Sequence, residues 1–128
     1  MEAQGSAPSS GAAPAVDPAA VVRLQRLGGD KLVRQMIRLY LENAVTRLAQ
    51  IDGGLSAESG LDEVRRGAHS LKSSAANVGA LRVSATAAQL EEVTESGDRE
   101  TAQRLRATLW RNLEEAREKL EGIAEGLA

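Results

Sequence analysis

The single histidine of the chain, His69, is the residue best placed for chemistry. The spacing of apolar residues predicts a helix over residues 61–78, in which His69 lies roughly 130° from the centre of the apolar stripe and faces solvent. Arg65 and Arg66 precede it by about one turn, and Lys72 follows it by one turn. An exposed imidazole among cations could carry a phosphoryl group, because Lys72 could reach the phosphoryl oxygens.

Small residues on the same helical face add to this interpretation. Ser73 and Ala76 would leave room for another protein to approach His69. Geometry alone leaves a simpler alternative open, in which His69 is one more solvated polar residue, since an exposed histidine with basic helical neighbours is common. The residues around His69 therefore suggest a phosphoryl-carrying site without establishing one.

The composition excludes several other kinds of site. The chain has no cysteine and one histidine, which removes disulfides, thiolate nucleophiles, cysteine-ligated zinc and multi-histidine metal sites. We therefore expect no metal and no cofactor. There is no GxxxxGK[ST] sequence, so no ATP site is predicted. Glu91, Glu92 and Glu95 have no histidine or cysteine partner at suitable spacing, and we interpret them as a solvated face rather than a hydrolytic site.

Charge and hydropathy narrow the partners and the location. The formal net charge of -2 disfavours an electrostatic nucleic-acid binder. No apolar run approaches the ~18 to 20 residues needed to span a bilayer, and no signal peptide is visible at the N-terminus. These features predict a cytoplasmic protein that binds neither nucleic acid nor membranes. The initiating Met favours a free-standing protein over a piece of a larger kinase.

The elements that would position His69 are all helical. Aromatic residues make up only 2% of the chain, so the core must come from Leu, Val, Ile and Ala, which suits close-packed helices. We predict an all-α, antiparallel up-down-up-down four-helix bundle with a short extra N-terminal helix. The Ala/Gly/Ser/Pro-rich residues 1–16 are expected to be a disordered tail, and residues 17–128 the bundle domain. The expected helices are 18–27, 30–56, 61–78, 81–95 and one from about residue 99 onward, with Gly28, Gly29 and Gly79 at helix ends.

The segment HSLKSSAANVGA, residues 69–80, resembles the signature of histidine-containing phosphotransfer (HPt) domains. That signature has an apolar residue two positions after the histidine, a lysine three positions after it, small residues, and then a Gly-Ala pair. Residues 27–30 and 89–91 resemble further elements of the family, and the likeness covers about residues 18–125. The chain departs from the family where Ser73 replaces the usual glycine. Its hydroxyl could bond to the ring or phosphoryl group, or could crowd a partner.

This resemblance implies a phosphorelay intermediate without an ATP site, and not an autonomous enzyme. His69 would accept a phosphoryl group from the phospho-aspartate of a receiver domain and pass it to another receiver, while Lys72 would stabilise the phosphate. The docking residues would be Arg65, Arg66, Ser73 and Ala76, and Gly79 would be structural. The implied partners are response-regulator receivers, which bring Mg²⁺, with a hybrid sensor kinase as a further candidate. We expect a monomer. The alternative is a scaffold that binds receivers or helices without phosphoryl transfer.

Overall fold

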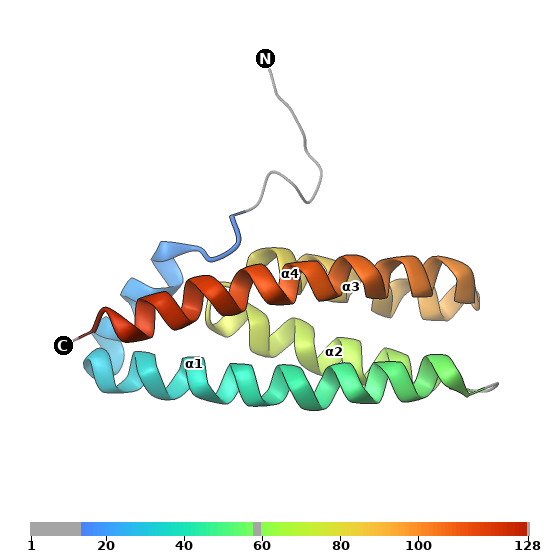
Figure 1. Cartoon of the computed structure of the whole chain (residues 1–128), viewed down its shortest axis with the longest axis horizontal. Coiled ribbons are helices and arrows are strands. Elements are labelled where there is room, and N and C mark those ends of the chain that lie inside the picture. Colours follow the sequence, from blue (N-terminus) through green and yellow to red (C-terminus); the bar gives the residue numbers. More distant parts are fainter. Residues whose placement is uncertain (1–13, 58–59, 128) are drawn as a thin grey trace, which may run out of the picture.

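The structure is a computed structural model that describes residues 14–57 and 60–127. Within these residues the chain forms four α-helices, which are α1 (Pro18–Ser56), α2 (Leu61–Asn77), α3 (Leu81–Ser96) and α4 (Arg99–Glu125). Each helix packs against the next in the chain, and α1 also packs against α4 (Figure 1). The connections are short, so neighbouring helices run antiparallel around a common core. The predicted all-α, up-down-up-down bundle is confirmed.

The short extra helix expected at the N-terminus is present as the first part of α1. Its start is capped by Asp17, whose side chain accepts a hydrogen bond from a first-turn backbone amide at 3.0 Å. It ends at Gly28 and Gly29, which have non-helical backbone angles, with φ of 71° at Gly29. Asp30 accepts a hydrogen bond from Gln25 across this kink at 3.1 Å. The two helices are thus joined by a sharp kink, and the first crosses one end of the bundle (Figure 1).

The core consists mainly of aliphatic side chains from all four helices, together with Tyr40 of α1. The largest fully buried side chains are Ile51, Leu71, Leu90, Leu109 and Leu120. Burying a side chain of this size stabilises the fold by roughly 1.5–3 kcal/mol. This packing decides which face of each helix points into the core. The opposite face of each helix is therefore exposed to solvent.

The residues just before α1 contact the bundle. Most of the tail predicted over residues 1–16 lies outside the described residues. Val16, however, is partly buried against the core. The backbone amide of Asp17 donates to the carbonyl of Gly79 at 2.8 Å. The apolar side chain of Val16 thus lies against the bundle, next to the residue that bonds to the turn between α2 and α3.

Gly79 is expected to be among the most sensitive backbone positions. It has φ of 79°, and a Cβ there would lie 2.8 Å from both the Ala20 Cβ and the Asp17 carbonyl oxygen. We expect Gly79→Ala to lower the free energy of unfolding by about 2–4 kcal/mol, from left-handed strain plus steric overlap. Gly97 has φ of 75°, and a Cβ there would meet no atom within 4 Å, so Gly97→Ala tests the strain alone. Urea unfolding measures the free energy of unfolding of both variants. If both lose the same amount relative to the wild type, the steric overlap at Gly79 contributes nothing, which would contradict the prediction.

Candidate functional site

His69 projects from the outer face of α2. The inward face of this helix is formed by Val64, Ala68, Leu71 and Ala75, all of which are fully buried. Packing of these side chains turns His69 away from the core, and 60% of its side chain is exposed. The solvent-facing position predicted from the helical spacing is confirmed.

Glu91, on the neighbouring helix α3, connects the two α2 residues singled out from the sequence. One carboxylate oxygen, Oε2, lies 2.7 Å from His69 Nδ1. The other, Oε1, accepts a hydrogen bond from Lys72 Nζ at 2.9 Å. Only 20% of the Glu91 side chain is exposed, because α3 packs closely along α2 at this level. A single carboxylate therefore holds the imidazole and the ammonium in fixed positions relative to each other.

The interpretation of the α3 glutamates as a solvated face is wrong for Glu91. It is right for Glu92 and Glu95, which are not buried in the bundle. Sequence spacing could not find the contact with His69, because the two residues lie on different helices 22 positions apart. The sequence contained one indication, since residues 89–91 resemble an element of the family. That resemblance did not indicate which residue Glu91 contacts.

The charge on Glu91 fixes the position of the imidazole proton. The hydrogen bond from Lys72 lowers the pKa of the Glu91 carboxyl, assisted by the hydrogen bond from His69, and these effects outweigh its partial burial. Glu91 is therefore ionised at neutral pH and can only accept hydrogen bonds. His69 Nδ1 must then carry the proton and donate it to Glu91. In the neutral ring, this leaves the lone pair on Nε2, the nitrogen that does not contact Glu91.

The ionisation of Glu91 should make the stability of the fold depend on pH. A lowered pKa means that the ionised Glu91 stabilises the fold at neutral pH, and that this contribution is lost as the pH falls through the folded-state pKa. We expect Glu91→Gln to destabilise the fold at about pH 7, with a smaller difference from the wild type at about pH 3. Urea unfolding at both pH values measures it. In Lys72→Ala, carboxyl NMR titration should place the pKa of Glu91 nearer its ordinary value, and an unchanged pKa would contradict the assigned cause.

The two arginines before His69 are paired with carboxylates of the first turn of α2. Arg65 bonds to Asp62 at 2.6 Å, and Arg66 bonds to Asp62 at 2.8 Å and to Glu63 at 3.3 Å. The hydrogen bond from Arg65 also lowers the pKa of Asp62. The surface around His69 therefore has mixed charge, which corrects the cationic surroundings expected from the sequence. The spacing of three and four residues was visible in the sequence and could have predicted these pairs.

The surface on the C-terminal side of His69 is open. Ser73 and Ala76 both reach the surface of α2, one and two turns beyond the histidine. Ser74, between them, accepts a hydrogen bond from Asn43 of α1 at 2.8 Å, which anchors this part of α2 to the bundle. Gly79 lies just beyond the end of α2, away from His69. The predicted small-residue surface is thus adjacent to the imidazole, whereas Gly79 belongs to the turn.

Two kinds of feature are absent from the described part of the chain. Within residues 14–57 and 60–127, no group of three or more His, Cys, Asp or Glu side chains could hold a metal ion. None of the helices described by the structure is both long and apolar enough to cross a membrane.

Comparisons with known proteins give a consistent picture. The family model described as "Hpt domain" matches residues 35–126. The fold is similar to the crystal structure of histidine-containing phosphotransfer protein B (HptB) from Pseudomonas aeruginosa PAO1, with a TM-score of 0.83 and 22% identity over 91% of this chain and 100% of that chain. It is also similar to the X-ray structure of a rice protein assigned to the histidine-containing phosphotransfer type, with a TM-score of 0.76 and 25% identity over 84% of this chain and 79% of that chain. No curated protein matches the chain.

Proposed function

The chain belongs to the Hpt domain family of phosphotransfer modules, and we propose that His69 is its phosphoryl acceptor and a receiver-domain phospho-aspartate its donor. The observation that carries this assignment is the pairing at the imidazole. His69 is the single histidine of the chain, its ring is exposed, and its Nδ1 lies 2.7 Å from the Glu91 carboxylate. The remaining nitrogen, Nε2, is therefore the nucleophile.

The proposed step is a direct displacement at phosphorus. The Nε2 lone pair of His69 attacks the phosphorus of the phospho-aspartate in line with the bond to the aspartyl oxygen. The N–P bond forms as the P–O bond breaks, and the aspartate leaves as a carboxylate. The Nδ1 proton stays on the ring, so the phosphorylated imidazole is cationic and faces the negative charge of Glu91. Transfer to a second receiver reverses the same step.

Lys72 and Glu91 have different proposed roles in this step. Lys72 lies one turn beyond His69 and neutralises charge on the phosphoryl oxygens, while its bond to Glu91 keeps the ammonium close to the ring. Glu91 is a positioning residue, since it acts on the phosphoryl group through His69. Mg²⁺ is expected on the receiver. The surface formed by Arg65, Arg66, Ser73 and Ala76 is the proposed contact for the receiver.

Phosphoryl transfer from a receiver tests this function directly. Receiver domains of the source organism are phosphorylated with a radiolabelled small-molecule acyl phosphate in the presence of Mg²⁺, freed of the remaining donor, and mixed with the chain. We expect label on the chain that is labile in acid and stable in base, as for phosphohistidine. The scaffold alternative gives a complex with a receiver and no label on the chain. Absence of label with every receiver, or label that is stable in acid, would overturn the proposal.

A further inference from the structure

The cations near His69 lie on two different sides of the imidazole. Around the helix axis of α2, Lys72 is turned about 60° from His69 in one direction, and Arg66 about 60° in the other. Lys72 bonds to Glu91 of α3 at 2.9 Å, so its side of the imidazole faces α3. Arg66 therefore lies on the side of His69 that faces away from α3.

The position of a phosphoryl group on His69 follows from the contact with Glu91. The Nδ1 atom lies 2.7 Å from the Glu91 carboxylate on α3. Because the two nitrogens of an imidazole point away from each other, Nε2 points away from α3. A phosphoryl group on Nε2 is thus on the same side as Arg66. Side chains three positions apart on a helix are neighbours, so the long arginine side chain can reach the phosphoryl oxygens.

The bonds that hold Arg66 in the unphosphorylated chain are easily given up. Arg66 bonds to Asp62 at 2.8 Å and to Glu63 at 3.3 Å, and all three side chains are at least half exposed. Ion pairs with this exposure are weak. Each carboxylate also has a second partner, since Arg65 bonds to Asp62 at 2.6 Å and Gln50 of α1 bonds to Glu63 at 3.0 Å. Arg66 can therefore leave without depriving either carboxylate of its last hydrogen bond.

A phosphoryl group is a stronger partner for an arginine than an exposed carboxylate is. It carries nearly two negative charges and three acceptor oxygens, and the guanidinium presents parallel N–H donors that bind two of these oxygens at once. Lys72 approaches from the α3 side only and shares its ammonium with Glu91. Arg66 supplies the cation for the other side of the phosphoryl group.

We propose that Arg66 binds the phosphoryl group of phosphorylated His69, and that Asp62 competes with the phosphoryl group for Arg66. The inference rests on the proposed function for the position of phosphorus on Nε2. It gives Arg66 a role in the phosphorylated chain itself, in addition to the proposed contact with a receiver. Asp62 then limits how strongly the phosphoryl group is held.

NMR of the arginine side chains tests this contact without a receiver. Phosphoramidate transfers its phosphoryl group to an imidazole and releases ammonia, so it can phosphorylate the single histidine of the full chain directly. With ¹⁵N-labelled arginine, we expect phosphorylation to shift the Nε–H signal of Arg66, which the Arg66→Gln variant identifies by its absence. An Arg66 signal that stays in place would overturn the proposal.

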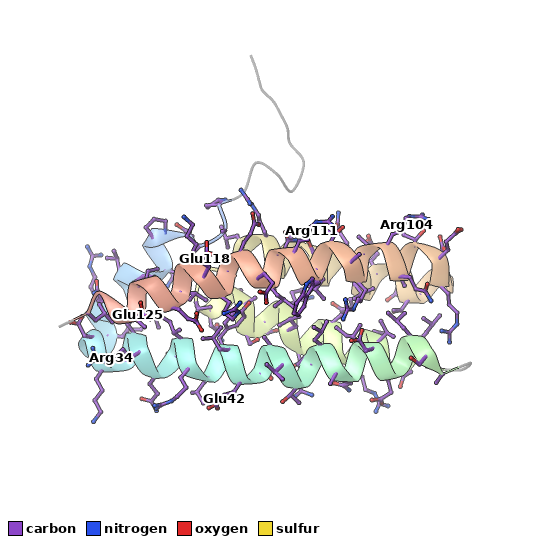
Figure 2. The ribbon with its side chains drawn as sticks, viewed as in Figure 1. Arg34, Glu42, Arg104, Arg111, Glu118 and Glu125 are labelled. Carbon is purple, nitrogen blue, oxygen red and sulfur yellow. The ribbon has the colours of Figure 1, made fainter. Side chains whose placement is uncertain are left out.

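Arg117 is the matched control in the same spectrum. It is likewise shared by two carboxylates of its own helix, Glu114 at 2.7 Å and Glu121 at 3.3 Å. It belongs to α4, which packs against α1 and α3 and whose outer face carries the labelled Arg111 and Glu118 in Figure 2. We expect no shift of the Arg117 signal. An equal shift of both signals would show a general effect of charge and would also overturn the proposal.

The equilibrium between the chain and a receiver measures the competition. In dilute solution the ratio of phosphorylated chain to phosphorylated receiver does not depend on how tightly the two proteins dock. We expect Arg66→Gln to lower this ratio about 10-fold, because a hydrogen bond between charged groups is lost. Asp62→Asn should raise it about 2- to 5-fold, because a competing ion pair is removed. Arg117→Gln should leave it unchanged.

Two results of the equilibrium measurement would overturn the proposal. One is a ratio in Arg66→Gln equal to that of the wild type, and the other is a ratio in Asp62→Asn below that of the wild type. Both substitutions are at exposed side chains, so the fold should be retained. If no receiver phosphorylates the wild-type chain, the proposed function fails, and the spectrum of the chain phosphorylated by phosphoramidate still decides whether Arg66 binds the phosphoryl group.

Discussion

Replacing His69 with glutamine is expected to abolish phosphoryl uptake and leave the fold intact. The amide nitrogen of glutamine is not a nucleophile, so no N–P bond can form at this position. The fold should survive because the side chain is mostly exposed and glutamine is a good helix former. Label transfer from a phosphorylated receiver measures uptake, and circular dichroism with urea unfolding measures the fold.

Arg104→Gln is the matched control for this substitution. It introduces the same residue on α4, at a side chain with 66% exposure, close to that of His69. We expect uptake close to that of the wild type, since Arg104 lies outside the proposed receiver contact and bonds to residues of its own helix. Wild-type labelling of the His69→Gln variant would show that the phosphoryl group is carried elsewhere.

Removal of the Glu91 carboxylate is expected to have the second largest effect. In Glu91→Ala the ring loses a charge-assisted hydrogen bond, a class of interaction that contributes roughly 1.5–3 kcal/mol. Transfer should therefore slow by about 10- to 100-fold, since each 1.4 kcal/mol corresponds to about a factor of ten. Glu91→Gln keeps an acceptor for the Nδ1 proton and should fall between Glu91→Ala and wild type.

The imidazole tautomer separates this positioning role from a merely structural one. In the wild type, the neutral His69 ring should carry its proton on Nδ1, and ¹⁵N chemical shifts of the ring report this directly. In Glu91→Ala both tautomers should be populated. Glu92→Ala, at the exposed neighbouring position, should change neither the rate nor the ring shifts. A Glu91→Ala variant with the wild-type rate and a single Nδ1–H tautomer would refute the role given to Glu91.

The sequence was most informative where the structure depends on a single helix. The period of the apolar residues placed the buried face of α2, and this face directly determines that His69 is exposed. The glycines of the sequence also marked the kink at Gly29 and the turn at Gly79. Both residues have positive φ, a backbone conformation that residues with a side chain disfavour. These features are local and follow from a few adjacent residues.

Contacts between helices could not be predicted in the same way. The bond from His69 to Glu91 depends on how α2 and α3 are rotated and shifted against each other, which the packing of the whole core decides. The pairing of Arg65 and Arg66 with Asp62 and Glu63 is different, since its spacing was available within one helix.

The most direct test is the NMR spectrum of the chain after phosphorylation by a receiver. The chain contains one histidine, so selective ¹⁵N labelling gives signals from a single ring. We expect coupling between ³¹P and the Nε2 nitrogen of His69, with Nδ1 still protonated and facing Glu91. Phosphorus on Nδ1, or a phosphorylated chain in which neither ring nitrogen couples to phosphorus, would contradict the central claim.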